Sequence, residues 1–67
     1  MYLNNLQQLR LEKELTQEDL SRISRIPRSE IANIESGSIL NPSVYCAIRL
    51  AKALNVKVED IFIFTDD

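Results

Sequence analysis

The sequence predicts an all-α fold of five helices, with a small antiparallel β ribbon formed by the two ends of the chain. Apolar residues recur at helical spacing along most of the 67 residues, as they do in amphipathic helices. Residues that begin or end helices, among them Thr16, Gly37 and Ser43, divide this pattern into short segments. Both ends of the chain instead carry aromatic and β-branched residues, which favour strands.

A first helix is predicted over about residues 5–13, where Leu6 and Leu9 share one helical face. A second helix is predicted to begin at Thr16, because a threonine hydroxyl can accept a hydrogen bond from the first turn. Asp19 stands where a capping box has Glu or Gln, so the box is expected in a shortened form.

The third helix is predicted over about residues 27–36. Pro27 is suited only to the front of a helix, since it lacks a backbone N–H group, and Gly37 is suited to the end. The pattern over about residues 16–37 therefore predicts two short helices joined by a tight turn. This helix-turn-helix arrangement is one whose second helix can enter the major groove of DNA.

The turn between these helices has an unusual residue. Arg25 stands where a glycine with positive φ commonly ends a helix, and a side chain there costs about 1 kcal/mol. Ile26 precedes a proline and is expected to be extended. On the helix before the turn, Leu20 and Ile23 are the residues expected to face the core.

A fourth helix is predicted between Ser43, as its cap, and Asn55, and a short fifth helix over about residues 58–62. The apolar stripe predicted for the fourth helix consists of Val44, Ala47, Ile48, Ala51 and Leu54, widened by Leu50. Within the tail, residues 61–67, the β-branched and aromatic residues 61–65 are expected to pair with residues 1–3 as a ribbon. Such a ribbon is marginal unless it packs on the helices or on a second subunit.

Length and composition predict one folded domain over residues 1–67, with 45% hydrophobic residues and one glycine. A chain this short buries only about 60% of its unfolded surface, and dimerisation is a common remedy. One cysteine and no histidine exclude a disulfide framework and an ordinary zinc site, so no metal or other cofactor is expected. No apolar run approaches the roughly 20 residues that span a bilayer, and we expect a cytoplasmic protein without membrane contacts.

The charge is unevenly distributed although the net charge is only −2. Three arginines and no acid lie between Arg22 and Arg28, whereas residues 57–67 contain one lysine and four acids. If the basic region meets phosphate, the acidic end should point away from it.

Several segments match the pattern of one known family in order and spacing. They are Leu9-Arg10, Thr16–Leu20, Ile31, Ile34–Gly37, Asn41–Ser43, Leu50–Val56 and Glu59–Phe62. Over about residues 5–62 the chain thus resembles the Cro/phage-repressor family of helix-turn-helix proteins, also called the xenobiotic-response-element family. The resemblance implies a five-helix, lambda-repressor-like DNA-binding domain whose third helix reads bases.

The function that the resemblance implies is sequence-specific DNA binding by a transcriptional regulator. We expect a repressor that binds a near-palindromic operator in double-stranded DNA as a homodimer, without a small-molecule ligand. We expect no enzyme activity, because the chain offers no nucleophile–base pair and no Gly-rich phosphate loop. The alternatives are a protein-interaction or antitoxin-like module and, within the DNA-binding class, the controller of a restriction–modification operon.

The resemblance also implies which residues meet DNA. They are Gln17, Arg28, Ser29, Glu30, Asn33, Ser36, Ser38, Asn41 and Ser43. The residues expected at phosphates are Gln17, Ser36, Ser38, Asn41 and Ser43, whereas Ser29 belongs to the helix end that points at the groove. Arg28 could pair with guanine, Asn33 with adenine, and Glu30 with cytosine.

Further residues have structural roles under this interpretation. The resemblance implies a partly buried ion pair between Arg10 and Glu35, and Cys46 is expected to be a packed small residue. Ser21 stands where the family has a small alanine. The dimer interface is expected to use Ile39, Leu40, Ile61, Ile63 and Phe64.

Overall fold

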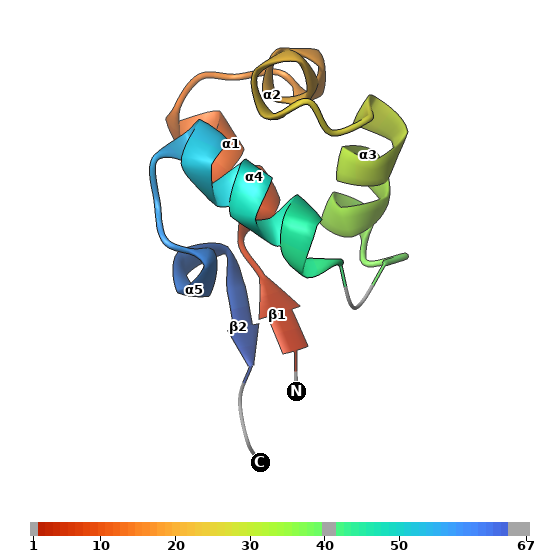
Figure 1. The fold of residues 1–67 in the computed structure, drawn as a ribbon, viewed down its shortest axis with the longest axis vertical. Coiled ribbons are helices and arrows are strands. Elements are labelled where there is room, and N and C mark those ends of the chain that lie inside the picture. The colour runs from red at the N-terminus through yellow and green to blue at the C-terminus, as the bar shows by residue number, and fades with distance from the viewer. Residues whose placement is uncertain (1, 40–41, 65–67) are drawn as a thin grey trace.

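The computed structural model describes the backbone of residues 2–39 and 42–64 and the side chains of residues 3–39 and 42–63. Within this part of the chain there are five helices and two strands (Figure 1). In chain order they are β1 (Tyr2–Asn4), α1 (Leu6–Glu12), α2 (Gln17–Ser24), α3 (Arg28–Ser36), α4 (Val44–Leu54), α5 (Val58–Ile61) and β2 (Phe62–Phe64). The predicted all-α fold with a terminal ribbon is confirmed.

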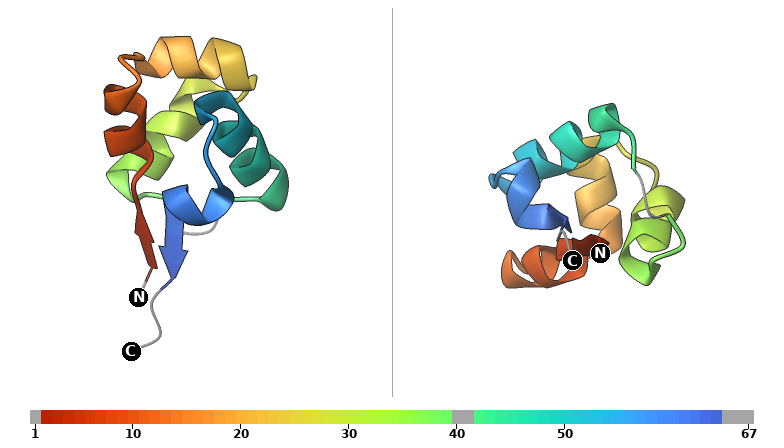
Figure 2. Two further views of the ribbon diagram at one scale, coloured as in Figure 1. Left: turned by 90° about the vertical axis from the view of Figure 1, so that its left-hand side faces the viewer. Right: turned by 90° about the horizontal axis from the view of Figure 1, so that it is seen from below.

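The five helices enclose one core in a domain that measures 35 × 20 × 19 Å. α2 lies at one end, α4 crosses the middle, and the ribbon projects from the opposite end (Figures 1 and 2). The largest side chains that are almost fully buried come from every helix: Leu6, Leu20, Ile31, Ile34, Leu50, Leu54 and Ile61. Burial of these apolar groups is the main force that holds such short helices together.

The start of α2 is fixed by the predicted capping box. The Thr16 hydroxyl accepts a hydrogen bond from the Asp19 N–H group at 2.9 Å, and the Asp19 carboxylate accepts one from the Thr16 N–H group at 3.0 Å. These bonds, with a smaller contribution from the neighbouring Arg22, hold the pKa of Asp19 below its ordinary value. A carboxylate at this position also suits the positive end of the helix dipole.

Serines hold the turn between α2 and α3. Arg25 ends α2 in the left-handed conformation, with φ of 62°, as its place in the sequence predicts. The Ser21 hydroxyl donates to the Ile26 carbonyl oxygen at 2.6 Å, and the Ile26 N–H group donates to the Ser24 hydroxyl at 3.2 Å. Ser21 therefore supplies a hydrogen bond to the turn that an alanine could not supply.

The ribbon joins the two ends of the described chain. Leu3 lies opposite Ile63 and Asn4 opposite Phe62 in an antiparallel pair. Next to it, the Asn5 N–H group donates to the Ile61 carbonyl oxygen at 2.7 Å, and the Asn4 amide donates to the Ile34 carbonyl oxygen at 3.1 Å. These bonds tie the base of the ribbon to α3 and α5.

Three residues expected in the core are instead on the surface. Ile23, Val44 and Ile48 are 51%, 75% and 42% exposed. In α4 the buried face is centred on Leu50 and Leu54, so Val44 and Ile48 fall beyond its edge. The packed position predicted for Cys46 is confirmed.

Candidate nucleic-acid interface

α3 presents a polar outer face opposite its buried face. Ile31 and Ile34 are fully buried, whereas Arg28, Ser29 and Asn33 are exposed. Among the described residues, the side chains of Arg28 and Asn33 have neither a hydrogen-bond partner nor an ion-pair partner. Their donors and acceptors are therefore available to an external partner such as a base edge.

The N-terminus of α3 has backbone N–H groups that are not used within the helix. Pro27 occupies the cap position and provides no side-chain hydrogen bond. Its carbonyl oxygen accepts from the N–H groups of Glu30 and Ile31, at 3.0 and 3.1 Å, but not from those of the first two helical residues. Free N–H groups at a helix N-terminus favour a bound anion.

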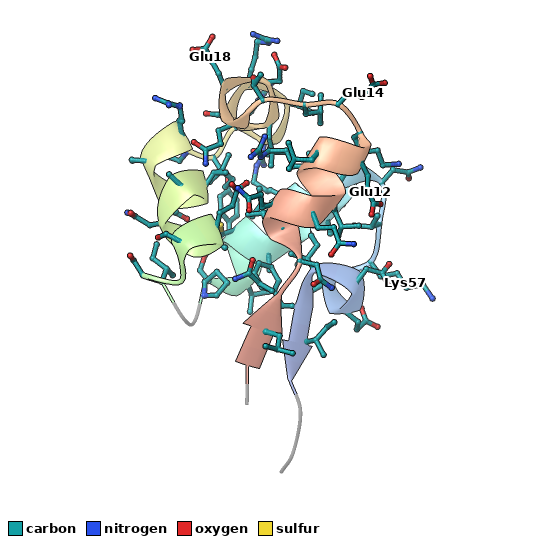
Figure 3. All side chains as sticks on the ribbon, turned by 180° about the vertical axis from the view of Figure 1, so that it is seen from behind. Glu12, Glu14, Glu18 and Lys57 are labelled. Atoms are coloured by element: carbon teal, nitrogen blue, oxygen red, sulfur yellow. The ribbon has the colours of Figure 1, made fainter. Side chains whose placement is uncertain are left out.

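The end of α1, the loop after it and the beginnings of α2 and α3 line a shallow depression of about 650 Å³. Gln17 and Arg28, predicted to contact phosphate and guanine, both contribute to it. Glu14 and Glu18 also contribute, and together with Glu12 they project outward on the side formed by α1 and α2 (Figure 3). These carboxylates would repel phosphate, so a DNA backbone passing Gln17 must avoid that side.

The ion pair between Arg10 and Glu35 is present and joins α1 to α3. Arg10 Nε donates to Glu35 Oε2 at 2.7 Å, and Arg10 Nη2 donates to Glu35 Oε1 at 3.1 Å. The two side chains are only 8% and 3% exposed. Arg10 Nη1 also donates to the Leu15 carbonyl oxygen at 2.7 Å, which fixes the loop before α2.

Glu35 also orients Gln17. The Gln17 amide donates from Nε2 to Glu35 Oε1 at 3.0 Å, so one buried carboxylate accepts hydrogen bonds from both α1 and α2. Gln17 is therefore already held in a fixed position relative to the outer face of α3 before any DNA binds. Such preorganisation lowers the entropic cost of a contact with phosphate.

Glu30 is separated from the other predicted base-reading residues. Its side chain is half-buried and its carboxylate interacts with the Cys46 thiol on α4. Burial of the thiol, with this hydrogen bond and the charge of Glu30, raises the pKa of Cys46 to about 12. The structure thus groups Arg28, Ser29 and Asn33 on one face and turns Glu30 toward α4.

The segment after α3 holds most of the remaining residues predicted to meet phosphate. The Ser36 hydroxyl donates to the Asn33 carbonyl oxygen and lies 3.1 Å from the Ser38 hydroxyl. Ser43 caps α4 by accepting from the Cys46 N–H group at 3.1 Å. Asn41 lies outside the described residues.

One residue predicted for the dimer interface is wrongly placed by the sequence interpretation. Ile61 is fully buried in the core of its own chain and offers no surface to a partner. Ile39 and Ile63 are half-buried. Leu40 and the side chain of Phe64 lie outside the described residues. The position of Ile61 follows from α5, whose single turn points this side chain inward against the other helices.

The sequence interpretation missed an apolar surface between α2 and α4. Ile23, Tyr45 and Ile48 are all exposed and line a groove of about 390 Å³. The signal was available in the sequence, since Tyr45 stands beside the predicted stripe of α4 and widens it beyond what one core can cover.

The fold and this interface define a five-helix protein with a helix-turn-helix. The model of a protein family with the description Helix-turn-helix matches residues 6–61 of this chain. An uncharacterised HTH-type transcriptional regulator of Methanocaldococcus jannaschii is 44% identical over 64 residues, which cover 96% of each chain. A second such regulator, of Archaeoglobus fulgidus, is 36% identical over 92% of this chain and 86% of its own.

Similarity also extends to a bacterium. The uncharacterised HTH-type transcriptional regulator YgzD of Bacillus subtilis is 34% identical over 88% of each chain. The chain belongs to the helix-turn-helix family of the Cro/phage-repressor type.

The described residues hold no candidate membrane span and no candidate metal centre. None of their helices is long and apolar enough to cross a membrane. Nor does this part of the chain bring together three or more Cys, Asp or Glu side chains that could hold a metal ion.

Proposed function

We propose that this protein is a cytoplasmic transcriptional regulator that binds a specific DNA sequence through the major groove. The observation that carries the proposal is the outer face of α3, where Arg28, Ser29 and Asn33 are exposed together beside an N-terminus with free donors. An arginine in this position can bind guanine O6 and N7 with two hydrogen bonds. An asparagine can pair in the same way with adenine N6 and N7.

Phosphate contacts would fix the protein on the duplex. Gln17 is held by Glu35 at the start of α2, Ser36 is the last residue of α3, and Ser38 follows it. On either side of the base-reading face, these groups could donate to neighbouring phosphates. Asn41 and Ser43 are further candidates, and Ser43 lies at the start of α4. Glu30 is the least suited of the predicted residues, because its carboxylate already interacts with Cys46.

We further propose a homodimer on a near-palindromic operator, acting as a repressor by occlusion of the polymerase. In such a dimer the two copies of α3 would enter successive major grooves about 34 Å apart. The ribbon supports this proposal, because a two-stranded ribbon is marginal alone and Leu3, opposite Ile63, is 46% exposed. Ile39, Leu40, Ile63 and Phe64 remain the candidate contacts after the exclusion of Ile61.

The test is a selection of bound duplexes from a random DNA pool at two salt concentrations. A two-fold-symmetric motif is expected for the natural chain, and Arg28→Ala should lose the preference at one base in each half-site. Lys57→Ala is the matched control, because Lys57 points away from α3 into solvent (Figure 3). Weak, unselective binding that modest salt abolishes would refute sequence reading and leave only phosphate attraction.

The exposed apolar surface of α2 and α4 favours one rival, a protein-interaction or antitoxin-like module. Ile23, Val44 and Tyr45 are each more than half exposed, and the net charge of −2 does not attract nucleic acid. Under this rival Arg28→Ala and Asn33→Ala would leave all binding unchanged. The same selection experiment therefore separates the two functions.

A further inference from the structure

The groove between the end of α2 and the outer side of α4 has no part in the proposed DNA contacts. Its apolar lining consists of Ile23, Tyr45, Ile48 and Ala53, and its charged lining consists of Arg49 and Lys52. Tyr45 is 64% exposed, which is a large aromatic surface to leave in water on so small a domain. Exposed apolar surface of this kind commonly marks a binding site.

Both charged side chains that line the groove are cations. No acidic residue lines it among the described residues, and neither Arg49 nor Lys52 forms an ion pair within that part of the chain. The chain as a whole is acidic, with a net charge of −2. The positive charge at this groove is therefore local, and it would attract an anion.

Arg49 is already held in place. Its Nε donates to the Ser24 carbonyl oxygen at 2.7 Å, and its guanidinium carbon lies 5.2 Å from the centre of the Tyr45 ring. Nη1 and Nη2 have no hydrogen-bond partner among the described residues, so four N–H donors remain. A guanidinium that is fixed beforehand can bind a carboxylate with two parallel hydrogen bonds at a reduced entropic cost.

The size of the groove favours a small molecule. Its volume of about 390 Å³ lies within the range of roughly 300–1,000 Å³ that is common for small-ligand sites. We propose that the groove binds an organic anion that has one carboxylate on a compact aromatic or branched aliphatic body. The body would lie against Ile23, Tyr45 and Ile48, and the carboxylate would meet Arg49 and Lys52.

The same arginine connects this groove to the turn of the helix-turn-helix. Arg49 binds the carbonyl oxygen of Ser24, and the hydroxyl of Ser24 accepts the N–H group of Ile26, two residues before α3. A bound anion that pulls on Arg49 would shift this turn and the start of α3. The consequence for DNA affinity rests on the function proposed above, whereas binding of the anion does not.

The experiment uses the full chain without DNA and 2-naphthoate as the probe. Titration calorimetry and backbone amide spectra should show saturable binding of one molecule, with shifts confined to α2, the turn, the start of α3 and α4. The neutral analogue 2-naphthamide should bind about tenfold more weakly, the equivalent of about 1.4 kcal/mol for a lost charge-assisted bond.

Three variants locate the site. Ile48→Glu places a carboxylate among the lining residues and should abolish binding, and Lys52→Gln should weaken it about threefold, as expected for a partly exposed ion pair. Lys57→Gln removes the same charge from a residue that does not line the groove, and this variant should bind 2-naphthoate like the natural chain. Folding of each variant is checked by its amide spectrum.

Three results would overturn the proposal. The first is the absence of saturable binding at millimolar 2-naphthoate, which would leave the apolar surface to a macromolecular partner. The second is equal affinity for the acid and the amide, and the third is binding that Ile48→Glu does not change. A parallel DNA titration with and without 2-naphthoate tests the coupling. If the protein bound no DNA in this titration, the proposed function would be refuted, but the proposed anion site would not be affected.

Discussion

Arg10 and Glu35 form a buried two-point ion pair that joins α1 to α3, with Nε to Oε2 at 2.7 Å and Nη2 to Oε1 at 3.1 Å. Because Arg10 also holds the Leu15 carbonyl oxygen and Glu35 also holds Gln17, four segments of the chain meet at one pair of charges. Their burial makes the pair sensitive to the loss of either partner.

Arg10→Ala should therefore lower the free energy of unfolding by about 3–5 kcal/mol, because it leaves the Glu35 carboxylate buried without its counter-charge. Urea denaturation followed by circular dichroism measures the change. Arg22→Ala is the matched control, since Arg22 pairs with Asp19 on the surface and its side chain is 70% exposed. An Arg10→Ala variant as stable as Arg22→Ala would show that the pair contributes little.

Arg25→Gly should stabilise the protein by up to about 1 kcal/mol, because a left-handed φ of 62° strains a side chain but suits glycine. The midpoint of thermal unfolding should rise accordingly. Arg22→Gly makes the same exchange inside α2, where glycine costs about 1 kcal/mol. If both variants were destabilised equally, strain at Arg25 would be ruled out.

Asn33→Ala should cost about 1–3 kcal/mol of DNA-binding free energy at the preferred site and relax selection at one adenine, since it removes the predicted paired hydrogen bonds. Competition binding against all four base pairs at that position provides the measurement. Ser36→Ala, which we place at a phosphate, should weaken binding to all of these duplexes by a similar factor. If Asn33→Ala also weakened binding to all four duplexes equally, Asn33 would contact the DNA backbone and not a base.

Stability should decline at alkaline pH through Cys46. Its ordinary pKa of 9.0 is raised to about 12 in the folded protein, so the folded state favours the neutral thiol. The resulting stabilisation is complete below pH 9 and is lost as the pH rises from 9 toward 12, because only the unfolded chain then releases the proton. Urea denaturation midpoints measured from pH 7 to pH 10 give the slope of stability against pH.

The slope is assigned by comparison with Cys46→Ala. This variant starts from a lower stability, because it leaves a small cavity, but it should show a shallower alkaline decline. Equal slopes in the two proteins would mean that other groups cause the decline.

Much of the fold follows from local chemistry that the sequence displays. Thr16, Pro27 and Ser43 mark helix starts, and Arg25, Gly37 and Asn55 adopt the left-handed conformation at helix ends. These signals depend on hydrogen bonds within a few residues, and they predict the same elements in any packing. The order of the helices and the position of the helix-turn-helix were predictable for this reason.

Burial was less predictable than helix boundaries. Val44 and Ile48 fit an apolar stripe, yet they are exposed, because the rotation of α4 is set by the helices against which it packs. Ile61 looked like part of an apolar tail, but α5 turns it into the core. Similarly, the contact of Glu30 with Cys46 joins α3 to α4 and has no local signal in the sequence.

The ribbon has a consequence for how the domain assembles. It pairs Leu3 with Ile63, so it closes a loop that contains nearly the whole chain. Contacts of such high sequence separation carry a large closure entropy, and they form after local helices have brought the ends together. The ribbon should thus be the last part to form and the first to open. Its amide hydrogens should exchange with solvent well before those of Leu20 or Leu50 in the core.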